Sequence, residues 1–285
     1  MYVFGEGERT IVIVSGIHGD ERNSVLASIL LARRLRRIEK TLNGRVIIIP
    51  IANFEAFKYR RRCSMIDGLD MNRSFPGSVS GSPTQQHAWR IWERCREVDY
   101  IIDMHTCGSC IPYILAKYGK KNIMDFIEKI PVRYVVRSHG TRGQLFIEAA
   151  EREVDALILE VPQPRCGLDL RLGKIFLRKI IQTLRNLDFL EGPKRKYDHI
   201  FLDKRIDIAS EVRGLFIPNK SPGDKVSMGE IIGRIRNRRI KSPIRGILLS
   251  IKPPSFVFCG EKVASIAPIL GQGDINQWGS AWWDK

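Results

Sequence analysis

The feature that most constrains the fold is an alternation of short apolar runs with longer segments of helical periodicity. Four apolar runs have the length of strands buried on both faces: residues 11–14, 45–53, 98–105 and 155–161. Apolar residues recur at helical spacing in three segments: residues 23–37, 85–98 and 168–187. Strands that alternate with helices favour a parallel sheet, because parallel neighbours need a long crossover connection. We therefore expect an α/β fold in which helices flank a mixed, largely parallel sheet.

The pattern of the chain changes after a polar, linker-like segment, Glu191–His199. Beyond it, Gly, Pro and short alternating strands dominate, as in the stretch GLFIPNKSPGDKVSMGEIIGRI. This pattern is typical of all-β structure with frequent turns. We predict two domains, a catalytic domain over residues 1–195 and a small all-β C-terminal domain over residues 196–285.

Composition excludes several classes of protein. With 44% hydrophobic residues among 285, the chain can bury a sizeable core, so intrinsic disorder is not expected. No apolar run approaches the roughly 20 residues of a membrane span, and the N-terminus lacks the features of a signal peptide. The six cysteines are scattered rather than arranged as a disulfide framework. We expect a cytoplasmic protein without a membrane partner.

The net charge of +16 is compatible with an acidic substrate, an acidic membrane surface or nucleic acid. Basic residues occur along the whole chain rather than in one tail, and the cluster RRLRR at residues 33–37 falls on the polar face of a predicted helix. We therefore do not expect nucleic acid to be the main partner, although tight binding to it near 0.15 M salt would restore that alternative.

Polar residues follow or end the predicted buried strands. His18 and Glu21 come after the first strand in the order H-x-x-E, Asn53 and His105 end the second and third, and Glu160 lies near the end of the fourth. Sites in open α/β sheets collect outside the carboxyl ends of the strands. We therefore expect these side chains to converge.

The H-x-x-E pair could supply two ligands to Zn²⁺, which in catalytic sites takes three protein ligands and a water. Alone, the pattern also fits an ordinary loop His and a Glu in the first turn of a helix. His105 is the best third ligand, while His87, His139 and His199 remain open. Asp103 lies two residues before His105, so it faces the same side of the strand and could orient that ligand.

The stretch DGLDMNRSFPG, residues 67–77, is a dense polar group. Asn72 and Arg73 suit a substrate carboxylate, because Arg offers a bidentate charged fork and Asn an amide donor. Glu160 is costly to bury at a strand end unless it is paired or used. It could be the general base of a metal-assisted hydrolysis, or simply a strand-end Glu that faces water.

Four motifs meet in one pattern: GIHGDE, NFEAF, DGLDMNRSFPG and DMHTCGS. In this order, over almost the whole chain, they resemble the aspartoacylase/succinylglutamate desuccinylase family of the zinc carboxypeptidase superfamily. The resemblance implies a zinc carboxypeptidase-like fold followed by a small lipoyl/biotinyl-like β barrel or sandwich. It also implies one Zn²⁺ per chain, held by His18, Glu21 and His105.

The same resemblance implies the catalytic groups. Glu160 would act as general base and then as general acid, and Arg62 would polarise the scissile carbonyl and stabilise the oxyanion. Arg60 and Arg61 are its neighbours, so which of the three arginines takes this role stays open.

Substrate binding follows from the resemblance as well. Asn72 and Arg73 would hold a substrate carboxylate, and Asn53 matches the Asn of the family's N-P-x-A segment, although Phe54 replaces the Pro. We expect a zinc-dependent hydrolase that cleaves the amide of an N-acyl amino acid or a related acylated amine. A carboxypeptidase acting on peptides and a non-enzymatic basic binding protein remain alternatives. The acyl group, the amine and the oligomeric state stay open, a homo-oligomer included.

Cys107 and Cys110 form a C-x-x-C pair directly after His105. Such a pair can be redox-active or bind a metal. Because the chain holds only one such pair, we predict instead that both are small buried residues that shape the floor of the pocket.

Overall fold

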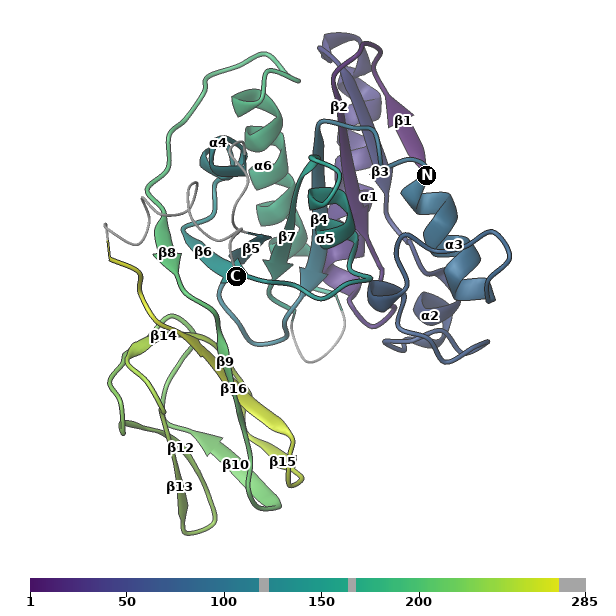
Figure 1. The fold of residues 1–285 in the computed structure, drawn as a ribbon. Helices are drawn as coiled ribbons and strands as arrows, with labels where there is room; N and C mark the ends of the chain where they lie inside the picture. The colour runs from purple at the N-terminus through teal and green to yellow at the C-terminus, as the bar shows by residue number, and fades with distance from the viewer. Residues whose placement is uncertain (118–122, 164–167, 272–285) are drawn as a thin grey trace, which may run out of the picture.

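The computed structural model describes residues 1–117, 123–163 and 168–271, and an eight-stranded sheet forms its centre (Figure 1). Its strands are β1 (Tyr2–Phe4), β2 (Thr10–Ser15), β3 (Arg45–Ile49), β4 (Tyr100–Thr106), β5 (Tyr113–Lys117), β6 (Tyr134–Ser138), β7 (Asp155–Val161) and β8 (Ile200–Leu202). The spatial order is β1-β3-β2-β4-β7-β5-β6-β8. Strands β3, β2, β4 and β7 are parallel, β1 and β5 pair antiparallel with their neighbours β3 and β7, and β6 and β8 follow the direction of β5. The predicted mixed, largely parallel sheet is confirmed.

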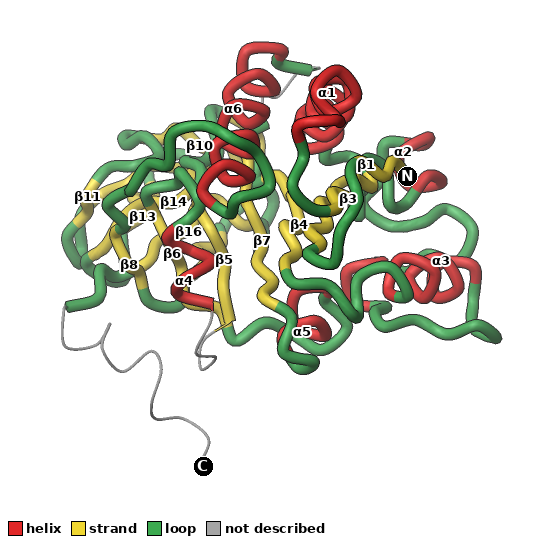
Figure 2. The backbone as a smooth tube through the Cα atoms, turned by 90° about the horizontal axis from the view of Figure 1, so that it is seen from above, coloured by secondary structure: helices red, strands yellow, loops and turns green. Residues whose placement is uncertain are grey.

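Helices cover both faces of this sheet (Figure 2). They are α1 (Arg22–Ile38), α2 (Phe54–Tyr59), α3 (Pro83–Trp92), α4 (Ile123–Glu128), α5 (Leu145–Ala150) and α6 (Leu170–Asn186), with short 3-10 turns η1 (Glu39–Thr41) and η2 (Met71–Arg73). Helices α1, α4 and α6 pack in one hydrophobic cluster and α3 and α5 in another.

Strand β2 shows why the sheet is buried on both sides. Ile11 and Ile13 belong to the cluster with α1 and α6, whereas Val12 and Val14 belong to the cluster with α3 and α5. Successive side chains of a strand point to opposite faces, so a continuous apolar run fits a sheet that lies between two helical layers.

One predicted helix has different bounds in the structure. The segment expected over residues 85–98 is α3, which begins at Pro83 and ends at Trp92. The start is earlier because the side chain of Gln85 accepts a hydrogen bond from the Ser82 N–H, 2.9 Å away, and Pro is favoured in the first turn. After Trp92 the chain tightens into turns, since the Cys95 N–H donates to the Trp92 carbonyl. The helical spacing of apolar residues in the sequence does not show where the helix ends.

Two antiparallel sheets follow the large one and lie below it in Figure 1. One has the order β13-β12-β10-β15 and the other β11-β14-β16-β9. Their strands are β9 (Ile206–Ala209), β10 (Gly214–Pro218), β11 (Lys225–Val226), β12 (Ile231–Ile235), β13 (Arg238–Lys241), β14 (Gly246–Ile251), β15 (Ser255–Val257) and β16 (Lys262–Ala267). Phe216 of the first sheet and Leu248 of the second share a third hydrophobic core. The predicted all-β character of this region is confirmed.

The division of the chain at residues 195 and 196 stays a prediction. Strand β8, which lies beyond that boundary, pairs with β6 and completes the large sheet, and Leu202 at its end bridges to Ile269. The two regions are therefore joined by shared β pairing.

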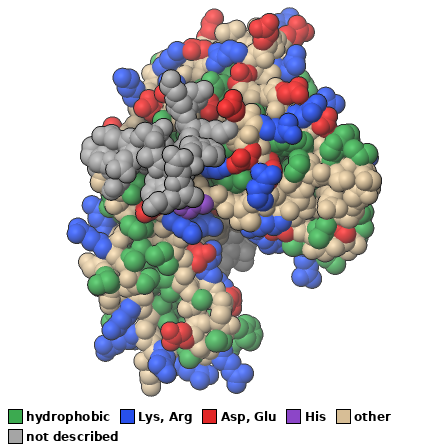
Figure 3. Space-filling model, in the orientation of Figure 1, with side chains coloured by type: hydrophobic (Ala, Val, Ile, Leu, Met, Phe, Trp, Pro, Cys, Tyr) green, Lys and Arg blue, Asp and Glu red, His purple; other side chains and the backbone are tan. Residues whose placement is uncertain are grey.

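Surface charge and hydropathy add two observations. Lys and Arg side chains are dispersed among Asp and Glu over the visible face of both regions (Figure 3). Within the described ranges, none of the helices combines the length and apolar character that crossing a bilayer requires.

Candidate active site

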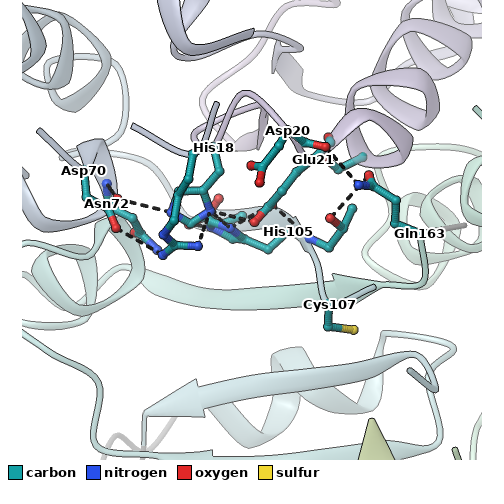
Figure 4. Close-up of polar contacts among 12 residues, drawn as sticks. His18, Asp20, Glu21, Asp70, Asn72, His105, Cys107 and Gln163 are labelled. Carbon is teal, nitrogen blue, oxygen red and sulfur yellow. Dashed lines mark hydrogen bonds and ion pairs between the residues drawn. The ribbon is translucent and has the colours of Figure 1, made fainter. Parts of the chain in front are cut away.

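Three potential metal ligands lie where two neighbouring strands end. His18 follows β2, Glu21 directly precedes α1, and His105 is the penultimate residue of β4. Because β2 and β4 are parallel neighbours, their carboxyl ends bring the three side chains to one edge of the sheet. The three residues are 2%, 6% and 3% exposed, and they point toward one another in Figure 4.

Glycine shapes the loop that carries His18. A Cβ at Gly19 would lie 1.9 Å from the backbone carbonyl carbon of Ala56, so only Gly fits at this position. The Gly19 N–H donates to the Arg61 carbonyl at 2.9 Å. The loop is thus held against the end of α2, and the position of His18 follows from this close approach.

The ligand atoms of the three residues face a common point. The Nδ1 atom of His18 lies 2.6 Å from Oε1 of Glu21, and the Nδ1 atom of His105 lies 3.1 Å from Oε2 of Glu21. The two Nδ1 atoms are 3.2 Å apart. In the described part of the chain, His18, Glu21 and His105 form the one group of three such residues whose ligand atoms all lie within 4.8 Å of one another.

This donor set fits Zn²⁺. Two ligand atoms about 2.0–2.1 Å from a tetrahedral zinc ion are roughly 3.3 Å apart, and the two Nδ1 atoms of His18 and His105 are separated by 3.2 Å. Two imidazoles and one carboxylate are also the composition of known catalytic zinc sites, which keep one position for water.

A carboxylate faces the second nitrogen of each histidine. The Nε2 atom of His18 lies 3.2 Å from Oδ1 of Asp70, and the Nε2 atom of His105 lies 3.0 Å from Oδ2 of Asp103. A carboxylate at Nε2 favours the tautomer with the proton on that nitrogen, which leaves Nδ1 free to bind a metal. The position predicted for Asp103 is confirmed.

The titration behaviour of the cluster reflects this mutual pairing. Burial raises the pKa of Glu21, but the two histidines outweigh it and hold this pKa at about 2. Burial lowers the pKa of His105, yet Asp103 and Glu21 outweigh it and raise this pKa well above the ordinary value. The carboxylates thus create an environment that favours positive charge between them.

Glu160 lies next to this cluster, near the end of β7. It is the register neighbour of His105 in the parallel pair β4–β7 and is 8% exposed. Its Oε2 atom is buried and has no hydrogen-bond partner among the described residues. Burial is the main cause that raises the pKa of Glu160. A carboxylate with a raised pKa at a site edge has the properties of a general base and acid.

Of the three consecutive arginines, Arg62 reaches the cluster. Its Nη2 atom donates to Oδ2 of Asp70 at 3.0 Å, and its Nη1 atom lies 3.5 Å from Nδ1 of His18. Its side chain is 51% exposed. Arg60 instead adopts the left-handed conformation that ends α2, and Arg61 contributes its backbone carbonyl to Gly19.

The polar loop before α3 brings Asn72 beside the cluster. Asp67 anchors this loop by accepting hydrogen bonds from Ser82 and Thr84. Asn72 is 3% exposed, and its Oδ1 atom has no partner among the described residues. Arg73 is exposed and donates to the Asn72 carbonyl at 2.6 Å. Asn72 is therefore fixed in place, whereas the guanidinium of Arg73 lies at the surface.

Asn53 has a local structural contact. Its side-chain oxygen accepts from the Ala56 N–H at 3.1 Å and so caps α2, while its Nδ2 atom is buried without a partner in the described ranges. It also lines a cleft of about 240 Å³ together with Thr84 and His87. Its amide oxygen thus binds α2 rather than the His–Glu–His cluster.

The remaining histidines lie away from the cluster. His87 belongs to α3, His199 places its Nδ1 atom 2.8 Å from the Val132 carbonyl, and His139 follows β6. None of them joins the group of ligand atoms found in the described residues.

Cys107 and Cys110 correct one prediction. They form a disulfide, and Cys107 is only half-buried, so the prediction of two small buried residues was wrong. Gly108 between them has φ of +68°, and the tight turn it permits leaves the two Cα atoms 5.9 Å apart, within the range of disulfides. The pair lines a cleft of about 850 Å³ with Ser250 and Phe256 of the C-terminal sheets, and Cys107 points away from the histidines in Figure 4.

Sequence reasoning missed the groups that support the cluster from outside. Gln163 donates to the Asp20 carbonyl at 2.9 Å and accepts from the Asn23 N–H at 3.3 Å (Figure 4). The Thr106 N–H donates to Oε2 of Glu21 at 2.9 Å. Gln163 lies three residues after Glu160, and this proximity was the one signal in the sequence that pointed to it.

Known proteins resemble this chain in sequence and in fold. Residues 7–171 match the model of the succinylglutamate desuccinylase/aspartoacylase catalytic domain. The chain is 28% identical to the N-alpha-acetyl-L-2,4-diaminobutyric acid deacetylase of Halomonas elongata, over 93% of this chain and 84% of that protein. Its fold is similar to the crystal structure of a succinylglutamate desuccinylase/aspartoacylase from Rhodobacter sphaeroides, with a TM-score of 0.82 and 24% identity over 94% and 88% of the two chains. The product-bound ectoine utilization protein EutE (DoeB) of Ruegeria pomeroyi gives a TM-score of 0.81 at 22% identity, over 93% and 87%.

Proposed function

Because this chain belongs to the succinylglutamate desuccinylase/aspartoacylase family, we propose that it is a zinc-dependent deacylase of N-acyl amino acids or related acylated amines. The observation that carries this proposal is the buried cluster of His18, Glu21 and His105 beside Glu160. Glu160 is the register partner of His105 in the parallel strand pair β4–β7. A pure binding protein has no need of such a cluster next to a buried carboxylate.

The metal would be held by the two inward-facing Nδ1 atoms and by the carboxylate of Glu21. When bound, zinc supplies Lewis acidity, which lowers the pKa of water and polarises a carbonyl group. Asp70 and Asp103 hold the Nε2 side of His18 and His105, so the ligands are oriented before any metal arrives.

Glu160 would move the protons of the reaction. Its carboxylate takes a proton from the attacking water and delivers it to the nitrogen of the leaving amine, so the amide C–N bond breaks as the amine becomes a good leaving group. The guanidinium of Arg62 lies beside His18 and would stabilise the negative charge that develops on the carbonyl oxygen.

A carboxylate on the substrate would be bound by Asn72 and Arg73. Asn72 is fixed by the loop, while the exposed Arg73 can swing to form a charged fork with a carboxylate. Asn53 would contribute its Nδ2 atom, which is buried without a partner among the described residues.

The named activities of relatives suggest where to look for the substrate. The relative from Halomonas elongata is named for deacetylation of an acetylated diamino acid, whereas the family model is named for succinyl- and aspartate-derived amides. A small N-acyl amino acid is the class common to these names.

The experiment that tests the function measures release of primary amine from a panel of N-acetyl, N-succinyl and longer N-acyl amino acids. N-acetylated diamino acids and short peptides with free C-termini belong in the same plate, each with and without a metal chelator. We expect chelator-sensitive cleavage of one acyl class. Chelator-insensitive cleavage would contradict the zinc-dependent mechanism, and cleavage of peptides alone would favour a carboxypeptidase.

A further inference from the structure

Arg205 lies at the junction of the two regions of the molecule. It follows β8 of the large sheet and directly precedes β9 of the C-terminal sheets, where the chain passes from one region to the other in Figure 1. Its Nη1 atom donates to the hydroxyl of Tyr113, 2.9 Å away and distant by 92 positions in the sequence. The contact therefore exists only because the two regions pack together.

Tyr113 connects this arginine to the candidate active site. Tyr113 is 1% exposed and is the first residue of β5, the strand that runs antiparallel to β7. Tyr113 and Glu160 are direct partners in that pairing. Directly opposite residues of antiparallel strands project to the same face of a sheet, so the phenol ring lies beside the carboxylate of Glu160.

The charges around Glu160 give Arg205 a role. The guanidinium of Arg205 is held by the hydroxyl of Tyr113, the strand partner of Glu160, so a positive charge lies on the Tyr113 side of that carboxylate. The Oε2 atom of Glu160 is buried without a partner in the described chain. Among residues 1–117, 123–163 and 168–271, Arg205 forms no ion pair within 4.0 Å, so its charge is not neutralised by direct contact with another carboxylate.

We propose that Arg205 is a positioning residue for Glu160, delivered to the active site by the chain that leads into the C-terminal sheets. Its hydrogen bond fixes Tyr113 beside the carboxylate, and its charge favours a single orientation of that carboxylate toward His105. This proposal rests on the proposed function, because it assumes that Glu160 moves the protons. It also gives the connection between β8 and β9 a part in catalysis.

The test compares Arg205→Met, which keeps the length of the side chain, with Arg205→Lys and Tyr113→Phe. Lys204→Met is the matched control, since it removes the same charge from an exposed neighbour. Steady-state kinetics use any substrate that the wild-type enzyme hydrolyses. We expect Arg205→Met to lower kcat by about 10- to 100-fold, as is typical when a residue that orients a functional group is lost, with KM changed less than about twofold.

Zinc content, stability and the other variants test the same role of Arg205. Zinc content and melting temperature should stay close to those of the wild type, Arg205→Lys should recover most of the lost kcat, and Lys204→Met should behave as the wild type. Tyr113→Phe should also lower kcat. In the double variant with Arg205→Met, the two decreases in kcat should not multiply, because the two residues act as one unit.

Two kinetic outcomes would overturn the proposal. A raised KM with unchanged kcat would make Arg205 a substrate-binding residue, and unchanged kinetics would leave it a purely structural contact. If Arg205→Met does not fold, Tyr113→Phe decides between the same outcomes, because it removes the hydroxyl that accepts the hydrogen bond of Arg205.

A second measurement separates this proposal from the proposed function. If the wild-type enzyme hydrolyses nothing in the panel, the deacylase assignment fails, and a crystal structure of Arg205→Met decides the role of the arginine. The proposal expects the carboxylate of Glu160 to change its rotamer or its distance from His105. A carboxylate in the wild-type position would contradict it.

Discussion

The candidate active site has two sides that are built in different ways. The proposed metal side consists of side chains that are less than one-tenth exposed, His18, Glu21 and His105. Each lies at the end of a strand or helix and faces a carboxylate or a backbone N–H. The proposed substrate side presents the guanidinium groups of Arg62, which is half exposed, and of Arg73, which lies at the surface.

This difference indicates how each side works. Buried ligands with fixed partners can bind a metal without rearrangement, so little free energy is spent on ordering them. Exposed arginines on a loop retain rotamer freedom until a charged substrate orders them. We therefore expect substitutions of the proposed metal ligands to act on metal content and turnover. Substitution of Arg73 should act mainly on KM, whereas substitution of Arg62 should also lower turnover, because its proposed partner is the developing oxyanion.

The largest expected effect comes from His105→Ala. It removes one of three ligands from a closed cluster, so the protein should lose nearly all of its zinc and its activity should fall by more than about 1,000-fold. Metal analysis of the purified protein and the amine-release assay measure both effects. Full zinc stoichiometry would point to another third ligand and would break the distinction between the two sides.

Glu160→Gln should have the next largest effect. It keeps the shape of the side chain but removes the proton acceptor, so kcat should fall by about 100- to 10,000-fold while zinc content stays unchanged. The combination of retained metal and lost turnover distinguishes Glu160 from the ligands. Near-normal turnover would remove this residue from the proton transfer steps.

Asp103→Asn should have a smaller effect that is specific to the metal side. The side chain is fully buried and faces Nε2 of His105, so removal of its charge should weaken zinc affinity by about 10- to 100-fold. Competition with a chromophoric chelator measures the affinity. The exposed Asp198→Asn serves as a control that removes the same charge elsewhere, and equal affinity in the two variants would contradict the role of Asp103.

The smallest effect is expected from Arg73→Ala. Because the guanidinium is exposed and its recorded contact is with the Asn72 carbonyl, the loss should raise KM by about 10-fold and leave kcat and zinc content nearly unchanged. The nearby Arg90→Ala on the exposed part of α3 is a suitable control. A drop in kcat without a change in KM would show that Arg73 belongs with the catalytic groups instead.

Sequence reasoning predicted the parts of the molecule that have local signals. The apolar runs around residues 11–14 and 155–161 became β2 and β7, because strands buried on both faces carry a continuous apolar pattern. The candidate ligands follow from that pattern, since polar residues directly after such strands meet at one sheet edge. Their convergence in the structure agrees with the prediction, while their roles in catalysis stay predictions.

The parts that were missed depend on contacts between distant segments. Residues 106–154 contribute β5, β6, α4 and α5, which are short and were not recognised. Strand β5 runs antiparallel to β7, which places its first residue, Tyr113, opposite Glu160. The hydrophobic pattern of the sequence does not indicate this change of strand direction. The hydrogen bond from Arg205 joins positions 92 apart, so it can be known only once the fold is known.

The shared strand β8 has a consequence for how this protein can be divided and how it evolves. A clone that ends at residue 195, or at the end of the matched stretch 7–171, would leave the outer edge of β6 with unpaired backbone groups, and open sheet edges invite aggregation. The N-terminal region is therefore not an interchangeable module. Gene fusion or loss of the C-terminal region would have to keep residues 200–202 with the large sheet.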